Sequence, residues 1–585
     1  MNSTAATFNL SQPGGFAFAL VFISLVLACH GGGIPAVEKI YYNGNIITVD
    51  EEFAVAQAVA VSRGRFVAVG SDEDVLSLAC PKTEKVDLRG RTMLPGLIEG
   101  HSHPEIASLS ELERPLANPR TVKQCLAWIA ELVRLKQSGE WIVHPKLFAT
   151  RLAEMRTPSL AELDSVAPLN PVFLNGGFGG MVNSAALRAS GIGESTEHTG
   201  LLREPASGQL SGKMHFSAFE LLKIPLAVEL DLAEKARALA GLFGRYNSVG
   251  FTSCASGATL PADSLLYQYM QEQDILTVRA FLNVEEPFAF KGMSLEKAAG
   301  ETSSLKMVTG QGNQWIRTGA LKTYIDGGIL TGTAFMNQGW GKRAREIFGI
   351  SDPNYRGSLM LNKDDFYVFA RSGAEAGWQV AAHCAGDGAV DLALDVFERL
   401  NEEVPLEPLR CSIIHGNFIS DKAIERAAGL NILLQMQPAW FYKDADALRD
   451  ILGEEYMDTF HPYRSLIEAG VRICAGSDHM AILDDVESIN PYNPWLAIGA
   501  MVTRRTERGT VISPREAISR EDALRCYTIN NAWASLEENV KGSIEAGKYA
   551  DMVVIDRDYL NCSEDEIKDI QVEMTMLGGE VVFEK

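Results

Sequence analysis

The middle of the chain alternates short apolar runs with longer stretches of helical periodicity. The short runs lack the strict polar alternation of a half-exposed strand, which favours strands that are buried on both faces. Other stretches, such as REDALRCYTINNAWASL, space their apolar residues as an amphipathic helix does. The predicted strands are Met93–His101, Gly250–Cys254, Arg279–Val284, Gly319–Ile325, Gln379–His383, Cys411–His415, Ile432–Met436 and Arg472–Ser477. Strands that alternate with helices in this way predict an α/β fold, specifically a (β/α)8 TIM barrel.

The two ends of the chain are β-rich instead. The run KIYYNGNIITVDEEFAVAQAVAVSRGRFVAVG is broken by Asn-Gly and Arg-Gly turns, and KGSIEAGKYADMVVIDRDYL near the other end has a similar pattern. We therefore expect residues 36–92 and 533–585 to form two parts of one β-sandwich around a barrel at 93–532. Because the connection after the first strand is too long for one helix, residues 105–247 are predicted to be an insertion over the barrel mouth.

Residues 1–35 form a distinct extension. FAFALVFISLVLAC, residues 16–29, is too short to span a bilayer but long enough for the core of a signal peptide. Its VLAC ending looks like a bacterial lipobox with Cys29 as the lipid-bearing residue. Residues 1–15 contain no Lys or Arg, unlike an ordinary signal peptide, so an unstructured extension or a mis-assigned start is the alternative. We expect a protein of the bacterial cell envelope, periplasmic or anchored in the membrane by this lipid, with the cytoplasm as the alternative.

Charge and cysteine content narrow the class of partner. The formal net charge of −22 argues against binding to nucleic acid or to anionic membrane surfaces, both of which need an excess of Lys and Arg. The nine cysteines include no C-x-x-C pair and no even spacing, so no disulfide framework is predicted. A small-molecule ligand suits such a chain better.

The ends of the predicted strands carry side chains that can bind a metal. In a (β/α)8 barrel the active site lies at the carboxyl ends of the strands. The strand-end residues are His101, His103, Lys322, His383, His415 and Asp478. Each alone has a plain alternative: the H-x-H pair fits hydrogen-bonded core histidines, and Asp478 fits an ordinary turn. Together, neutral imidazoles and a carboxylate suit one or two divalent ions such as zinc and leave positions open for water.

Lys322 is the unusual member of this set, because an ammonium group repels cations. A buried lysine with a depressed pKa can react with CO₂ to give a carbamate, which is an anionic ligand. A contact between Lys322 and an anionic substrate is the alternative.

Seven segments carry a resemblance to a known family. They are LPGLIEGHSH, VNSAALRASGI, LKTYIDGG, HCAGDGAVDLALDVFE, IIHG, AGSDH and KGSIEAGKYADMVVID. From about Lys39 to its end, the chain resembles the amidohydrolase superfamily, in particular amidohydrolase family 3 with its N-substituted formamide deformylase-like enzymes. The resemblance implies a composite β-sandwich and a metal-bearing barrel. It makes His101 and His103 the first-strand ligands, Lys322 a carboxylated bridge, His383 and His415 the second-metal ligands, and Asp478 both ligand and general base.

The resemblance also implies a reaction. A metal-activated hydroxide would cleave a carbon–nitrogen bond of a non-peptide amide or N-acyl compound, with Asp478 moving the proton to the leaving nitrogen. A cyclic amidase, an esterase or a deaminase could use the same site, and a catalytically silent binding or regulatory protein is the alternative from another class. A homodimer is compatible with the resemblance.

Three residues depart from the family pattern where substrate is expected to bind. Phe178 stands where relatives usually carry a His, and it fits either an apolar pocket or a plain core. His144 lies in EWIVHPKLFATRL, which replaces a Gly- and Trp-rich loop; it could reach the site or be an ordinary satisfied histidine. His479 replaces a usual Trp and could contact substrate or only fill space. Asn183 and Trp495 belong to recurring motifs and are interpreted as structural.

Overall fold

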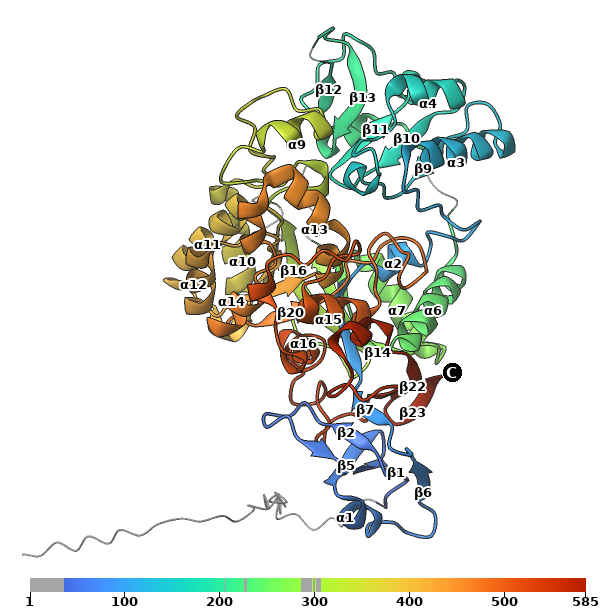
Figure 1. Ribbon diagram of the computed structural model, residues 1–585, viewed down its shortest axis with the longest axis vertical. Helices are drawn as coiled ribbons and strands as arrows, with labels where there is room; N and C mark the ends of the chain where they lie inside the picture. Colours follow the sequence, from blue (N-terminus) through green and yellow to red (C-terminus); the bar gives the residue numbers. More distant parts are fainter. Residues whose placement is uncertain (1–35, 205, 226–228, 286–296, 298–299, 301–306) are drawn as a thin grey trace, which may run out of the picture. The chain divides into compact units, whose positions relative to one another are not determined.

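The computed structural model describes residues 36–204, 206–225, 229–285, 297, 300 and 307–585 (Figure 1). Cys29 and the apolar segment that precedes it lie outside these residues, so the predicted lipid anchor stays a prediction. Within the described ranges no helix has the length and apolar character needed to cross a membrane. The cysteines of these ranges are all free.

An eight-stranded parallel sheet forms the centre of the fold, with the strand order β20-β19-β18-β17-β16-β15-β14-β8. Its strands are β8 (Leu97–Ser102), β14 (Phe251–Thr259), β15 (Arg279–Glu285), β16 (Ile316–Tyr324), β17 (Val380–Cys384), β18 (Ser412–His415), β19 (Leu433–Met436) and β20 (Ile473–Ala475). Every neighbouring pair runs parallel, and helices fill most of the connections. The predicted α/β barrel class is confirmed.

Helices cover the outside of this sheet. They are α6 (Leu232–Ser248), α7 (Pro261–Glu272), α10 (Lys363–Glu375), α11 (Asp387–Asn401), α12 (Asp421–Gly429), α13 (Pro438–Leu452), α14 (Tyr463–Glu468), α15 (Pro494–Thr503), α16 (Arg520–Cys526) and α17 (Ile529–Ala534). In α6, Asp231 and Glu234 form a capping box, and Ala236, Leu239 and Phe243 lie on the buried stripe. Because helices cover one face of the sheet and barrel side chains fill the other, the central strands β17, β18 and β19 are wholly buried.

One predicted strand, Met93–His101, is two strands in the structure. β7 (Thr92–Pro95) pairs with strands near both ends of the chain, whereas β8 pairs with β14 in the barrel. The break falls at Gly96, where a Cβ atom would lie 2.2 Å from Oγ1 of Thr252. The prediction of one continuous strand is therefore wrong, because the two halves of this apolar run pair in different sheets.

The barrel closes through side chains and close backbone contact between β8 and β20. Asn531 Nδ2 donates to the carbonyl of Ile98 at 2.7 Å and to that of Ala475 at 2.9 Å. A Cβ atom at Gly476 would lie 2.3 Å from the backbone nitrogen of His101. Just beyond, the Asp478 N–H donates to the His101 carbonyl at 2.7 Å. The first and last strands are thus held together at the end of the barrel that carries the candidate ligands.

The segment after β8 contains a five-stranded sheet of its own, in the order β12-β13-β11-β10-β9. Its strands and helices are α2 (Pro104–Ala107), α3 (Val122–Leu135), β9 (Ile142–His144), α4 (Leu160–Val166), β10 (Val172–Asn175), β11 (Gly179–Val182), α5 (Ser184–Ser190), β12 (Leu201–Arg203) and β13 (Leu210–His215). Helix α6, which follows, packs against β14 and α7 of the barrel. Asn183, interpreted as structural, caps α5 by accepting from the Ala186 N–H, and its side chain also bonds the backbone of Ala167 and Asn170.

Two further sheets lie outside the barrel, and the six-stranded one combines strands from near both ends of the chain. The four-stranded sheet holds β1 (Lys39–Tyr42), β4 (Ala58–Ser62), β5 (Arg65–Gly70) and β6 (Glu84–Asp87), beside helix α1 (Asp72–Leu76). The six-stranded sheet adds to β7 the strands β2 (Asn45–Ile47), β3 (Val55–Ala56), β21 (Met552–Ile555), β22 (Val572–Leu577) and β23 (Glu580–Glu584). Tyr41, Phe66, Met93 and Val554 share one apolar core between them. The predicted domain boundaries remain a prediction.

Short connections complete the fold. They are helix α9 (Gly341–Phe348) and the 3₁₀ turns η1 (Ala149–Arg151), η2 (Phe216–Leu221), η3 (Ile329–Thr331), η4 (Glu407–Leu409), η5 (Glu454–Thr459), η6 (Pro514–Glu516) and η7 (Glu564–Asp569). Trp495, interpreted as structural from the sequence, is fully buried in α15 and packs edge-on against Tyr559.

Candidate metal centre and substrate cavity

The strand ends of the barrel open into a cavity of about 600 Å³. Five of the six predicted ligand residues line this cavity: His103, Lys322, His383, His415 and Asp478. The sixth, His101, is fully buried, with its ring centroid 5.5 Å from that of His103 and 5.7 Å from that of His415. The structure therefore brings all six together around one space, because parallel strands of a barrel end at the same face.

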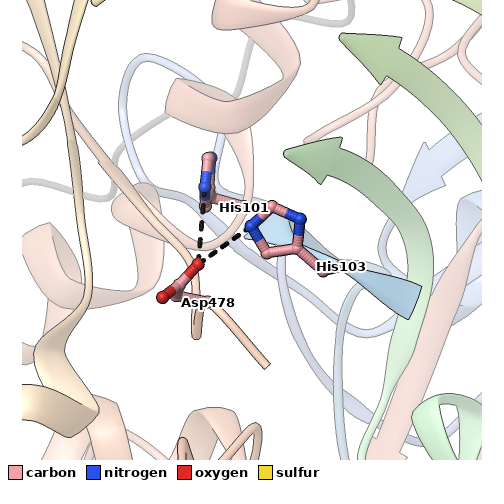
Figure 2. Close-up of side chains that lie close together, drawn as sticks. All are labelled: His101, His103 and Asp478. Atoms are coloured by element: carbon pink, nitrogen blue, oxygen red, sulfur yellow. Dashed lines mark ion pairs between the residues drawn. The ribbon is translucent and has the colours of Figure 1, made fainter. Parts of the chain in front are cut away.

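Within this group, the possible ligand atoms of His101, His103 and Asp478 all lie within 4.8 Å of one another. Figure 2 shows these three side chains. Oδ1 of Asp478 lies 3.1 Å from Nε2 of His103 and 3.6 Å from Nε2 of His101. Burial by itself would raise the pKa of Asp478, but the hydrogen bond from His103 and the nearby imidazoles hold that pKa well below its usual range. Asp478 is therefore an ionised carboxylate at neutral pH.

Glutamine side chains set the tautomers of His101 and His415. Nδ1 of His101 donates to Oε1 of Gln435 at 3.3 Å, and Nδ1 of His415 donates to Oε1 of Gln437 at 2.7 Å. The amide of Gln435 is itself oriented by donation to Ser412, and that of Gln437 by donation to the Gln435 carbonyl. Both imidazoles consequently keep the lone pair on Nε2.

His383 is held in the opposite tautomer. Its Nε2 donates to the carbonyl of Gly327 at 3.0 Å and lies 3.8 Å from Oδ1 of Asp326, so the lone pair is on Nδ1. Asp326 accepts three backbone N–H groups, from Phe335, Ala385 and Gly386. These bonds join the loop after β16 to the loop after β17 and so position His383. Burial raises the pKa of Asp326 to about 7 despite these three bonds.

The buried imidazoles are neutral. Burial lowers the pKa of His415 to about 4, although Asp478 opposes the shift. Burial, with repulsion from the Lys322 cation, places the pKa of His101 well below its usual value, and the same holds for His383 with added repulsion from His415. A neutral imidazole is the form that binds a metal.

Lys322, at the end of β16, is 1% exposed. Burial lowers its pKa to about 8, against the attraction of Asp478 and Glu285. Its Nζ lies 4.8 Å from the ring centroid of Tyr324, whose hydroxyl donates to Glu285 at 2.9 Å. A substantial fraction of this amine is therefore neutral near pH 8, the form that can react with CO₂.

The atoms of this cluster fit a divalent cation. Nε2 of His101 is buried and has no hydrogen-bond partner among the described residues, although it faces an ionised carboxylate oxygen. An orphaned buried nitrogen costs free energy unless something binds its lone pair. Three imidazoles with oriented lone pairs, a fourth at His103 and one carboxylate are the donor set of borderline ions such as zinc.

Aromatic and aliphatic side chains form the remaining wall of the cavity. Phe178 lines it, with its ring centroid 5.0 Å from that of His383 and 6.1 Å from that of Phe216. Trp440 stacks on His415 at 5.0 Å with an interplanar angle of 12°. The structure thus puts Phe178, a predicted substrate contact, beside the candidate ligands.

The other two predicted substrate contacts do not line the cavity. Nε2 of His144 donates to the Ala117 carbonyl at 2.8 Å, and its Nδ1 accepts from the Lys146 N–H at 3.3 Å. Nε2 of His479 donates to the Ile482 carbonyl at 2.7 Å, and its Nδ1 accepts from the Tyr246 hydroxyl at 3.0 Å. Both rings are buried and use both nitrogens within the chain.

Five residues that orient the imidazoles or line the cavity were not predicted from the sequence. Gln435, Gln437 and Asp326 orient the imidazoles, and Lys146 and Trp440 line the cavity. Gln435 and Gln437 stand at and just beyond the end of β19, so the strand-end rule could have found them. Lys146 and Trp440 lie in a loop and a helix where that rule gives no information.

Comparison with known proteins agrees with this geometry. The sequence model of the amidohydrolase family matches residues 84–583 of this chain. The chain belongs to the amidohydrolase family. The N-substituted formamide deformylase of Arthrobacter pascens is 28% identical to this amidohydrolase over 556 residues, which cover 93% of this chain and 98% of that protein. The family resemblance seen in the sequence is confirmed.

Two other similarities extend over most of the chain. Protein LONG AFTER FAR-RED 3 of Arabidopsis thaliana is 25% identical over 562 residues, covering 92% of this chain and 91% of that protein. The crystal structure of an uncharacterized metal-dependent hydrolase from Pyrococcus horikoshii has the same fold, with a TM-score of 0.65 at 21% identity, covering 90% of this chain and 99% of that one. The protein is therefore a hydrolase of a metal-dependent family, with a candidate metal site in its barrel.

Proposed function

We propose that this amidohydrolase cleaves a carbon–nitrogen bond of a non-peptide amide or N-acyl compound with the help of a divalent metal. The main support is the orphaned Nε2 of His101, which faces the ionised carboxylate of Asp478 at 3.6 Å beside His103. The similarity to an N-substituted formamide deformylase favours an amide or formamide as substrate. In the overall reaction, water adds to the carbonyl carbon, the carbon–nitrogen bond breaks, and an acid and an amine are released.

The donor atoms suggest two neighbouring metal positions. His101, His103 and Asp478 would hold one ion, and His383, His415 and Lys322 would contribute to a second, with zinc as the expected metal. A bound ion would polarise the scissile carbonyl and lower the pKa of water toward ~7. Lys322 would first need to react with CO₂: its neutral amine forms a nitrogen–carbon bond, loses a proton and leaves an anionic carbamate oxygen.

Asp478 is the proposed proton carrier. Its Oδ1 faces the two imidazoles, whereas Oδ2 has one weak partner among the described residues, the side-chain nitrogen of Asn490 at 3.3 Å. Oδ2 is thus the atom best able to take a proton from the attacking water and return it to the leaving nitrogen. The hydrogen bonds that His415 and His383 donate to Gln437 and to the Gly327 carbonyl keep their lone pairs in place during this transfer.

The apolar wall supports the same reaction. Phe178, Phe216 and Leu330 line the same cavity as the imidazoles, and these apolar side chains would displace water beside a bound substrate. Electrostatic interactions between the carboxylate, the cations and a developing charge are stronger where water is excluded.

The test uses the full chain loaded with zinc or manganese and N-benzylformamide as substrate. We expect formate and benzylamine in equal amounts, loss of turnover after chelation, and recovery when metal is restored. Metal content is measured on the same sample. A protein that binds no metal after loading, or binds metal but hydrolyses no amide, ester or formamide, would contradict the proposal and favour a binding or regulatory role.

A further inference from the structure

One cation in the cavity wall belongs to neither half of the candidate metal site. Lys146 lies in the turn after β9, and its half-buried side chain lines the same cavity as Lys322 and Asp478. The turn is fixed on both sides, because the Lys146 N–H donates to Nδ1 of His144 and the Leu147 N–H donates to the Asn175 carbonyl at 2.7 Å. His144 therefore positions Lys146 rather than the substrate itself.

Lys146 has no counter-ion in the described part of the chain. No carboxylate oxygen there lies within 4.0 Å of its Nζ, and Nζ forms no hydrogen bond; the Phe148 ring centroid is 5.6 Å away. Arg151, a nearby cation, is already neutralised, with Nε and Nη2 each 2.7 Å from an oxygen of Asp444. Lys146 thus differs from its neighbour in carrying an unmatched charge into the cavity.

The two acidic side chains that line the cavity do not serve as counter-ions for Lys146. Oδ1 of Asp478 is engaged by His103, and Glu220 has a side chain that is 76% exposed and lies 3.8 Å from Nε2 of His198. Burial lowers the pKa of Lys146, while the attraction of Asp478 and the repulsion of Arg151 act in opposite directions. An ammonium withdrawn from water is stabilised most when an anion binds it.

The ammonium group of Lys146 packs directly against the backbone of Gly177 in the cavity wall. Gly177 has a φ of +85°, and a Cβ atom at that position would lie 2.7 Å from Nζ of Lys146. Any other residue would therefore be strained in its backbone and would occupy space next to the ammonium. Phe148, Phe178 and Leu330 line the cavity that Lys146 shares with the candidate ligands, so its wall suits an apolar scaffold.

We infer that Lys146 binds a carboxylate of the substrate, so that the preferred substrates are carbon–nitrogen compounds with a carboxylate on an apolar scaffold. This inference rests on the proposed function and narrows it to a substrate class. The scissile carbonyl would lie beside the candidate ligands His383 and His415, and the carboxylate would accept hydrogen bonds from Nζ of Lys146. A formamide without a negative charge would lack the second contact.

The kinetic test compares substrates that differ by one carboxylate. One pair is 4-(formamidomethyl)benzoate and N-benzylformamide, and the other is N-formylphenylalanine and N-(2-phenylethyl)formamide. Lys146→Met is expected to lower kcat/KM about 10- to 100-fold for the carboxylate member of at least one pair, mainly through KM, and to change the neutral members less than about twofold. Lys146→Arg should retain most of the preference, because it keeps the charge.

The matched control is Lys123→Met, which removes an exposed lysine from α3 of the same inserted segment and should change neither pair. Equal losses on charged and neutral substrates, or a wild-type enzyme without any preference for a carboxylate, would overturn the inference.

Equilibrium binding separates this inference from the proposed function. If metal-loaded protein hydrolyses none of the four compounds and no other amide or ester, the proposed function fails, and calorimetric titration of the four compounds then decides the role of Lys146. We expect the wild type to bind a carboxylate compound at least tenfold more tightly than Lys146→Met does, with no such difference for its neutral analogue. Binding that is absent, or equal in the two proteins, shows that Lys146 does not recognise a carboxylate.

Discussion

Nε2 of His103 lies 3.1 Å from Oδ1 of Asp478, although the two residues follow the first and the last strand of the barrel. The pair forms only where the barrel closes, and it holds the carboxylate ionised between two imidazoles. The chemistry proposed for this protein depends on that carboxylate, so it is the first position to change.

Asp478→Asn should lower kcat/KM for an amide substrate by about 100- to 10,000-fold, because the amide side chain cannot accept the proton from water. Far-ultraviolet circular dichroism should remain unchanged. Asp450→Asn, which alters an exposed acid on α13, is the control and should keep full activity. Unchanged turnover in Asp478→Asn would exclude it as the general base.

Gln437→Leu should weaken metal binding about 10- to 100-fold, because His415 loses the acceptor that fixes its tautomer. The measurement is competition with a chelator of known affinity. Gln379→Leu is the matched control: that glutamine bonds the carbonyls of Arg410 and Ala534 just before β17, away from the ligands, so its loss should change stability but not metal affinity. Equal metal affinity in Gln437→Leu and wild type would mean that Gln437 does not orient a ligand.

Gly476→Ala should destabilise the fold by about 1–3 kcal/mol, because the new methyl group would collide with the backbone of His101. Gly241→Ala provides the contrast. That exposed glycine in α6 has open space around it, and alanine there should stabilise the helix by about 0.5–1 kcal/mol. The urea unfolding midpoints of the two variants should move in opposite directions. Midpoints that both rise or both fall would argue against the close contact between Gly476 and the His101 backbone.

His144 should make the folded state less stable in acid. Burial lowers its pKa from 6.5 to about 4. Between these values the unfolded chain binds a proton at His144 and the folded chain does not, so stability is present above pH 6.5 and falls as the pH drops toward 4. The contribution is about 3 kcal/mol across this window. The free energy of unfolding of His144→Gln should decline less than that of the wild type between pH 7 and pH 4.5, and an identical decline would contradict the assignment.

We propose that the chain is attached to the cell envelope through a lipid on Cys29, which lies outside the described residues. Cys29→Ser should move the protein from the membrane fraction to the soluble fraction when it is expressed in a bacterium. The same fraction for both proteins would rule the lipid anchor out.

The barrel and its strand-end ligand candidates could be predicted from the sequence because both follow local rules. Buried parallel strands are apolar throughout, and the residues that follow them meet at one face. The break at Gly96 could not be predicted, because an apolar run does not reveal which of two sheets each half will join. The crowding by Thr252 that marks the break comes from a distant strand.

The roles of individual histidines were harder to predict for a related reason. His144 and His479 have the same side chain as the candidate ligands, but their nitrogens meet a carbonyl, an N–H or a hydroxyl supplied by the fold. Lys146 gave no periodic or strand-end signal, and the role proposed for it rests on the absence of a counter-ion among the residues that the structure describes. Such properties depend on contacts between distant segments, which a single sequence does not display.

The contact between β8 and β20 also determines at which stage of its synthesis this protein can become active. His101 and His103 are synthesised early, but Asp478 and the Asn531 bridge that joins the two strands are added only near the end of translation. Until then the emerging barrel has an open edge, and its first two imidazoles lack their carboxylate. The candidate metal site is therefore assembled last, so a prematurely released chain would hold neither a closed barrel nor the complete set of candidate ligands.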